Sequence, residues 1–136
     1  MHDQTLIQFR CTALVVDDEE DLREILINML TSLGLTVQSA PDGKAALEKI
    51  KGNHFDLVIS DIIMPIMDGI NLFEAMRQDQ TIHQPRFIFI SGGGVTDNQK
   101  LEAISTMIDG ILTKPCRRNL IIEKLCQLFP DKVLKK

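Results

Sequence analysis

Residues 55–60 read FDLVIS, a nearly continuous apolar run that ends at Asp61, and a helical pattern follows from about residue 70 to residue 77. Apolar runs of this length that contain Val and Ile are typical of strands buried on both faces of a sheet. Pro65 and Gly69 lie between the two patterns, as turn residues do. The stretch therefore predicts a strand, a loop and a helix in immediate succession.

The same order of strand and helix occurs five times along the chain. Further strands are predicted at residues 12–16, 35–39, 86–90 and 110–113, and further helices at 20–33, 42–50, about 97–107 and 118–129. Gly34 follows the first helical pattern directly, where a glycine commonly ends a helix. Regular alternation of apolar strands and helices predicts an α/β fold, with a parallel sheet covered by helices on both faces.

Length and composition are those of one soluble domain. The 136 residues are 44% hydrophobic and 25% charged, with a mean hydropathy of +0.03. No apolar run reaches the roughly 18 residues that span a bilayer, and residues 1–10 lack the apolar core of a signal peptide. We therefore expect a cytoplasmic protein without a membrane partner.

Charge, aromatic content and cysteine spacing exclude several classes of protein. The net charge of −4, with six Phe and no Trp or Tyr, argues against direct binding of nucleic acid, which uses basic surfaces and stacking platforms. Cys11, Cys116 and Cys126 are an odd, widely spaced set without a C-x-x-C pair. This pattern argues against a disulfide framework and against a zinc site.

Polar residues follow the ends of four predicted strands. The first strand ends in the acids Asp17, Asp18, Glu19 and Glu20, the third in Asp61, the fourth in Ser91, and the fifth in Lys114, which Pro115 follows. In open parallel sheets, ligands bind outside the carboxyl ends of the strands, so we expect the four ends to converge on one pocket. Two carboxylates about 5 Å apart repel each other by roughly 3 kcal/mol at an effective dielectric constant of about 20. One lysine does not balance three carboxylates, and Mg²⁺, which takes oxygen ligands and often shares its site with a phosphate, would do so.

Each of these residues also has a purely structural interpretation. The acids at 17–18 can precede a helix without binding a cation, and Glu19, with the acids that follow it, is expected to cap that helix and complement its dipole. Asp61 can close a turn, Ser91 can be an ordinary hydrogen-bonding residue, and Lys114 can be a surface residue. Their joint occurrence at successive strand ends favours a binding site.

Four segments carry a resemblance to a known family. They are Val15-Val16-Asp17-Asp18-Glu19, Ser60-Asp61-Ile62-Ile63-Met64-Pro65-Ile66-Met67-Asp68-Gly69, Phe89-Ile90-Ser91-Gly92, and Lys114-Pro115. With these segments the chain resembles the receiver domain of two-component response regulators. The resemblance implies a single doubly wound (βα)5 domain at 11–129 with the flavodoxin-like strand order. Residues 1–10 would be an N-terminal extension, and 130–136 a C-terminal tail.

The resemblance implies a Mg²⁺ cofactor and its ligands. Asp18 and Asp61 would bind the ion directly, and Asp17 would bind it directly or through water. The backbone carbonyl of Ile63 would supply a further oxygen. Asp68 is expected to cap the following helix instead of touching the ion.

The resemblance also implies the chemistry. Asp61 would accept a phosphoryl group from a sensor histidine kinase, a phosphotransfer protein or a small donor such as acetyl phosphate. Lys114 would contact Asp61 and then a phosphoryl oxygen, Ser91 would bond to the phosphoryl group, and the bond before Pro115 is often cis in the family. The chain would catalyse its own phosphorylation and dephosphorylation only, and is therefore not expected to be an enzyme acting on another substrate.

The expected function is a phosphorylation-activated switch that relays its state by conformational change. Its partners would be the phosphodonor and an output partner or output domain that the sequence does not identify. A monomer or a weak homodimer is expected.

Two departures from the family pattern affect the expected readout. The family commonly has an aromatic residue three positions before the lysine, and Ile111 occupies that position here. Bulky Met107-Ile108 replaces a common small pair, and the Gly92-Gly93-Gly94 run replaces larger residues. Glycines lower the barrier to backbone rearrangement, so we expect this loop to move on phosphorylation without an aromatic partner.

Alternatives from other classes remain. A receiver-like scaffold that does not use phosphorylation would be consistent with Ile111. A phosphohydrolase of the haloacid dehalogenase type usually needs a second Asp where this chain has Ile63. A flavodoxin would need phosphate donors in the first loop, which is acidic here.

Overall fold

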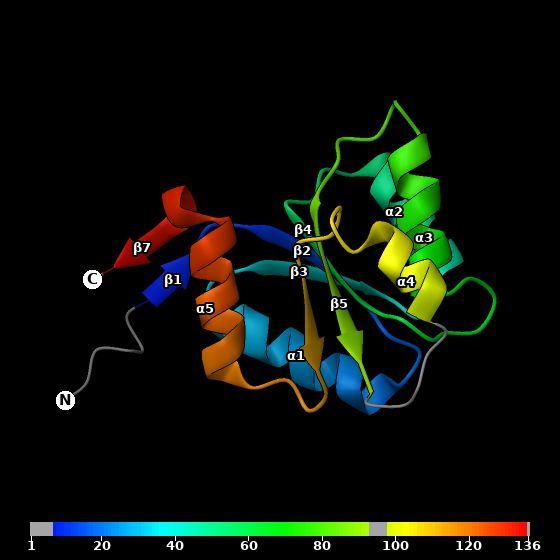
Figure 1. Cartoon of the computed structure of the whole chain (residues 1–136). Helices are drawn as coiled ribbons and strands as arrows, with labels where there is room; N and C mark the ends of the chain where they lie inside the picture. Colours follow the sequence, from blue (N-terminus) through cyan, green and yellow to red (C-terminus); the bar gives the residue numbers. More distant parts are fainter. Residues whose placement is uncertain (1–6, 93–97, 136) are drawn as a thin grey trace.

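The computed structural model describes residues 7–92 and 98–135, and its centre is a five-stranded parallel sheet (Figure 1). The strands are β2 (Thr12–Val16), β3 (Thr36–Ala40), β4 (Leu57–Asp61), β5 (Arg86–Ser91) and β6 (Gly110–Thr113). Their order across the sheet is β3-β2-β4-β5-β6, and all neighbours are parallel. The predicted α/β fold, including the flavodoxin-like strand order, is confirmed.

Helices cover both faces of the sheet. They are α1 (Glu20–Ser32), α2 (Gly43–Gly52), α3 (Gly69–Gln78), α4 (Asn98–Ile104) and α5 (Arg118–Leu128). Buried side chains of α1 and α5 share one core cluster, and those of α2, α3 and α4 share the other, so the two groups of helices lie on opposite faces (Figure 1). The helix predicted at about 97–107 ends at Ile104 and is shorter than expected. In the described part of the chain, no helix has the length and apolarity needed to cross a bilayer.

The three inner strands, β2, β4 and β5, are mostly buried, whereas the edge strands β3 and β6 are more exposed than predicted. Every residue of β4 is buried, whereas in β6 the side chains of Ile111 and Thr113 are exposed. The expectation that all strands would be buried on both faces is therefore wrong for the edges, because the helices cover the middle of the sheet most completely. On one face the core contains three edge-to-face phenyl rings, Phe73, Phe87 and Phe89, with centroid distances of 5.1 Å and 5.0 Å between successive rings.

Helix ends follow the local sequence. Gly34 has a φ of 97° and its N–H donates to the carbonyl of Thr31, so it ends α1 as predicted. The carboxylate of Asp68 accepts from the backbone N–H of Asn71 at 2.8 Å, which confirms its predicted capping of α3.

The two ends of the described chain form a small antiparallel sheet that the sequence patterns did not predict. β1 (Ile7–Phe9) pairs with β7 (Val133–Lys135), and the N–H of Arg10 donates to the carbonyl of Lys132 at 2.9 Å. Phe9 is 1% exposed and shares the core cluster of α1 and α5 with Phe129. Strands of three residues are too short to show a periodic pattern, which is why they were missed.

Candidate functional site

The carboxyl ends of the strands converge on one pocket of about 310 Å³. The residues that line it are Asp18, Glu19, Asp61, Ile62, Ile63, Ser91, Gly92 and Lys114. The chain order reverses between β2 and β4, which is where open parallel sheets bind ligands. The structure thus brings together Asp18, Asp61, Ser91 and Lys114, as the strand-end pattern predicted.

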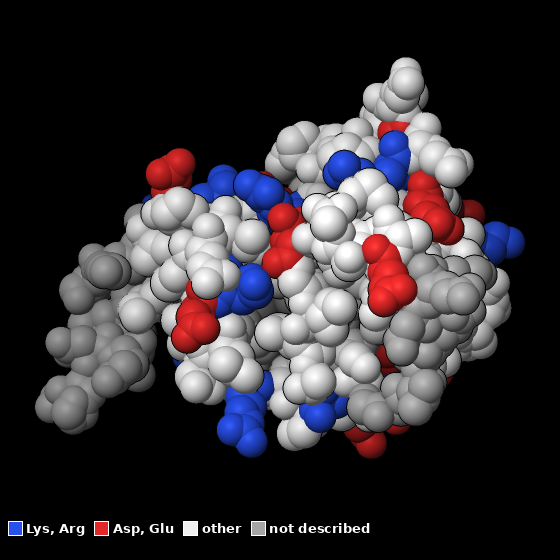
Figure 2. Space-filling view, in the orientation of Figure 1, with Lys and Arg blue, Asp and Glu red and all other residues white. Residues whose placement is uncertain are grey.

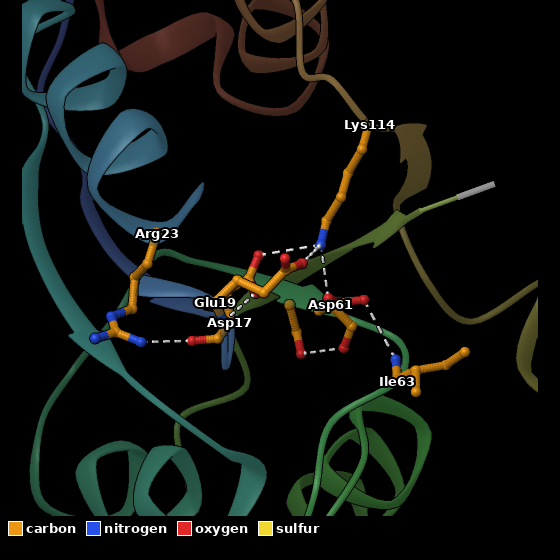
Figure 3. Close-up of polar contacts among 7 residues, drawn as sticks. Asp17, Glu19, Arg23, Asp61, Ile63 and Lys114 are labelled. Atoms are coloured by element: carbon orange, nitrogen blue, oxygen red, sulfur yellow. Dashed lines mark hydrogen bonds and ion pairs between the residues drawn. The ribbon is translucent and has the colours of Figure 1, made fainter. Parts of the chain in front are cut away.

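Asp61 is the last residue of β4 and is only 7% exposed. Its Oδ2 accepts a hydrogen bond from Nζ of Lys114 at 2.8 Å, and its Oδ1 accepts from the N–H of Ile63 at 3.3 Å (Figure 3). Gly69 packs so closely on the backbone of Asp61 that a Cβ there would collide with the Asp61 carbonyl. The start of α3 can therefore approach the end of β4 only because residue 69 is glycine.

Asp17 directly follows β2, which ends at Val16, and is 4% exposed. Its Oδ1 accepts from the N–H of Glu19 at 2.9 Å, and its backbone carbonyl accepts from Nη1 of Arg23 at 2.7 Å (Figure 3). Burial raises the pKa of Asp17, and the hydrogen bond from Glu19 and the charge of Lys114 oppose that rise. Asp18 is exposed and faces the pocket, so the two adjacent acids occupy different environments.

Lys114 is the cation that these acids share. Its Nζ lies 2.8 Å from Oδ2 of Asp61, 3.3 Å from Oε1 of Glu19 and 3.4 Å from Oδ2 of Asp17 (Figure 3). Burial favours the neutral amine, but the hydrogen bond and charge of Asp61, with the charges of the other acids, raise the pKa of Lys114 above its usual value. The peptide bond between Lys114 and Pro115 is cis, as the resemblance implied.

Glu19 and Arg23 take part in the site in ways that the sequence patterns did not predict. Glu19 was one of the strand-end acids but was expected to cap the helix that follows, and Arg23 was not singled out. Glu19 is at the N-cap position of α1, but its side chain makes no capping hydrogen bond and instead pairs with Lys114. The prediction that the Glu19 side chain caps the helix is therefore wrong. Its position directly after two strand-end acids was the available signal, whereas nothing in the local pattern pointed to Arg23.

The donor set fits a hard divalent cation. One carboxylate oxygen from each of Asp17, Glu19 and Asp61 lies within 4.8 Å of the other two. These three acids of the described chain are close enough together to hold a metal ion. Asp18, predicted as a ligand, lines the same pocket. Oxygen donors and no sulfur or imidazole suit Mg²⁺ better than zinc.

The residues that were predicted to respond to phosphorylation lie only partly within the described chain. Ser91 ends β5 beside the pocket and is half-buried, and Gly92 lines the pocket after it. Gly93 and Gly94 lie outside the described residues. Ile111, at the position of the common aromatic, is 43% exposed on the edge strand β6.

Comparison with known proteins identifies the family to which this doubly wound domain with its acidic pocket belongs. A family model of the response regulator receiver domain matches residues 13–126. The chain is 32% identical to the chemotaxis protein CheY of Pseudomonas aeruginosa over 117 residues, which cover 85% of this chain and 94% of that protein. It is 34% identical to CheY-3 of Vibrio cholerae over 117 residues, with 85% and 89% covered. The chain belongs to the response regulator receiver domain family.

Solved structures of the family have the same fold. CheY4 of Vibrio cholerae superposes with a TM-score of 0.76 at 27% identity, covering 88% of this chain and 98% of that one. The receiver domain of the Francisella response regulator 1452 gives a TM-score of 0.75 at 28% identity, with 88% and 97% covered.

Receiver domains are regulatory phosphoacceptor domains that pair with sensor histidine kinases, and they also occur inside such kinases. The sensor histidine kinase RcsC of Escherichia coli is 35% identical to this chain over 126 residues, which cover 90% of the chain but 12% of RcsC.

Proposed function

We propose that this receiver domain is a switch that is activated when Asp61 accepts a phosphoryl group in a Mg²⁺-dependent reaction. The observation that carries the proposal is the 2.8 Å contact between Asp61 Oδ2 and Lys114 Nζ inside the strand-end pocket. The Asp61 carboxylate therefore has the ammonium of Lys114 beside it, and the pocket that both residues line has room for a phosphoryl group. Both are needed for transfer, which depends mainly on positioning and charge neutralisation.

The reaction is a transfer from a phosphohistidine of a sensor kinase or phosphotransfer protein. A carboxylate oxygen of Asp61 attacks the phosphorus, the P–N bond breaks, and the imidazole leaves and takes up a proton. The product is an acyl phosphate on Asp61. Lys114 then pairs with a phosphoryl oxygen, and the hydroxyl of Ser91, which lines the same pocket, donates to another. Hydrolysis of the acyl phosphate returns the chain to its resting state.

Mg²⁺ would be held by Asp17, Asp18, Asp61 and the backbone carbonyl of Ile63. The support for this assignment is the cluster of carboxylate oxygens at the end of β2 and β4. When bound, the ion supplies charge neutralisation to the phosphoryl oxygens.

The phosphoryl group adds about −1.5 to −2 charge beside Lys114 and Ser91, and their response would start the conformational change. Moving a two-state equilibrium from 1:99 to 99:1 takes about 5.5 kcal/mol of differential interaction, which several charge-assisted contacts can supply. The change would be relayed to an output partner or output domain in the cytoplasm. Because Ile111 has no aromatic ring, the loop from Gly92 to α4 would carry the relay.

The charge distribution of the described residues on the visible face does not suggest nucleic acid as the direct output (Figure 2). Figure 2 shows the Lys and Arg side chains of the described residues scattered among acids on that face, and the whole chain has a net charge of −4. A protein output partner fits this charge distribution better than a nucleic acid does.

The test is phosphorylation with acetyl phosphate and Mg²⁺, followed by intact mass measurement. We expect one phosphoryl group on the wild-type chain, and none on Asp61→Asn or without Mg²⁺. Asp68→Asn is the matched control, because Asn caps a helix as well as Asp does, and it should be labelled like the wild type.

Two outcomes would contradict the proposal. Labelling that persists in Asp61→Asn would refute the site. Absence of labelling of the wild-type chain by acetyl phosphate in the presence of Mg²⁺ would favour the scaffold that does not use phosphorylation.

A further inference from the structure

Oε1 of Glu19 lies 3.3 Å from Nζ of Lys114, next to the carboxylates of Asp17 and Asp61. Glu19 precedes α1, whereas Lys114 follows β6 and Asp61 ends β4, so three separate segments meet at one ammonium. We propose that Glu19 is a positioning residue of the cation site: it shares the Lys114 ammonium with Asp61 and so leaves Asp61 more available to a divalent cation. This inference rests on the proposed function, because it concerns the same site.

The geometry of Lys114 supports this sharing. An ammonium has three N–H donors, and here it has three carboxylates within 3.4 Å. The contact to Asp61 is the shortest, at 2.8 Å, and the contact to Glu19 is 3.3 Å. Lys114 and a cation compete for the oxygens of Asp61. Any acid that holds Lys114 elsewhere therefore weakens that competition.

The charge balance of the pocket acts in the same direction. An oxygen of Glu19 lies within 4.8 Å of carboxylate oxygens of Asp17 and Asp61, so its negative charge attracts a cation bound between them. The side chain of Glu19 is 60% exposed, which means that water screens this charge. We therefore expect removal of the charge to weaken Mg²⁺ binding by about three- to ten-fold and not to abolish it.

The experiment is a titration with Mg²⁺ of the wild-type chain and of two variants, Glu19→Gln and Glu20→Gln. Binding is monitored by the NMR chemical shift of the backbone amide of Ile63, whose N–H donates to Asp61. The chain contains no Trp, so NMR replaces fluorescence. Glu19→Gln keeps the shape of the side chain and removes its charge. Glu20→Gln removes the same charge from the next residue, which is exposed on the first turn of α1 and does not line the pocket.

We expect the Kd for Mg²⁺ to rise about three- to ten-fold in Glu19→Gln and less than about two-fold in Glu20→Gln. Equal changes in the two variants would overturn the proposal, because Glu19 would then contribute only as one of several surface charges. Thermal unfolding of both variants controls for loss of fold.

A double-mutant cycle with Lys114→Gln tests whether Glu19 acts through the lysine. We expect the effect of Glu19→Gln on the Kd to shrink by at least about half when Lys114 is already replaced. An undiminished effect would show that Glu19 acts only by direct attraction of the cation and would overturn its role as a partner of Lys114.

Failure of this inference is distinguishable from failure of the proposed function. If the wild type binds Mg²⁺ and Asp61 is labelled, but Glu19→Gln behaves like Glu20→Gln, only the inference fails. If the wild type shows no Mg²⁺-dependent shift at Ile63, the proposed cation site fails as well.

Discussion

The guanidinium of Arg23 holds the backbone of the acidic turn that follows β2. Its Nη1 donates to the carbonyl of Asp17 at 2.7 Å, while the Asp17 carboxylate accepts from the N–H of Glu19. One hydrogen bond thus holds the backbone of Asp17 and the other holds its side chain. Together they orient the Asp17 carboxylate toward Lys114. The turn carries acids that repel one another, so its geometry depends on such bonds.

Replacement of Arg23 by Ala should therefore lower the free energy of unfolding by about 1.5–3 kcal/mol, the usual contribution of a hydrogen bond from a charged group. Urea unfolding measures the change. Glu24→Ala, at the next, exposed position of α1, should change stability by less than about 0.5 kcal/mol. Similar losses in the two variants would mean that the Arg23 contact does not hold the turn.

At the scale of elements, the end of α1 shows how one residue decides a connection. Gly34 has a positive φ of 97°, a conformation in which side chains are strained. A Cβ at this position would also lie 3.0 Å from the carbonyl oxygen and 3.2 Å from the nitrogen of Phe9 in β1. The turn after α1 and the small terminal sheet are therefore packed backbone against backbone.

Gly34→Ala should destabilise the chain by about 1–3 kcal/mol, because it adds both backbone strain and a close contact. The matched control is Gly52→Ala at the end of α2, where a Cβ meets nothing within 4 Å. That change should be neutral or stabilising by up to about 1 kcal/mol, since Ala favours the helix. Thermal and urea unfolding of the pair measure the difference, and equal stabilities would contradict the role of the positive φ.

At the scale of the whole molecule, the terminal sheet lies near the amino-terminal end of β2, and the acidic pocket lies at the carboxyl ends of the strands. β1 ends shortly before β2 begins, whereas the pocket lies beyond the end of β2. Phe9 of β1 is buried in the core cluster that contains side chains of α1 and α5, and it joins the terminal sheet to that cluster. A substitution at Phe9 should therefore lower the free energy of unfolding and leave the binding properties of the pocket nearly unchanged.

Phe9→Ala should cost about 3–5 kcal/mol of stability, as removal of a buried phenyl ring does. The Mg²⁺ Kd of the folded variant should change by less than about two-fold, because distant sites act nearly independently. Leu120→Ala, which shortens a side chain that is 41% exposed on α5, should lose much less stability. A large change in Mg²⁺ affinity in Phe9→Ala would show that the terminal sheet and the acidic pocket are coupled.

The sequence by itself determined the fold class and the positions of the main site residues. Apolar strand runs, each ended by a polar residue, are local patterns, and parallel topology then carries all strand ends to the same edge of the sheet. That reasoning anticipated the meeting of Asp61 with Lys114, which the structure shows. The capping of α3 by Asp68, predicted separately from the motif that contains it, is also observed.

The tertiary structure alone decided the contact of Glu19 with Lys114, the contact of Arg23 with Asp17, the exposure of the edge strands and the pairing of β1 with β7. Glu19 and Lys114 are 95 residues apart in the chain, and the local pattern around Glu19 is equally consistent with a helix cap. Whether a side chain caps its own helix or reaches across a pocket depends on the path of a distant loop. That path results from the packing of the whole domain, which no local pattern specifies.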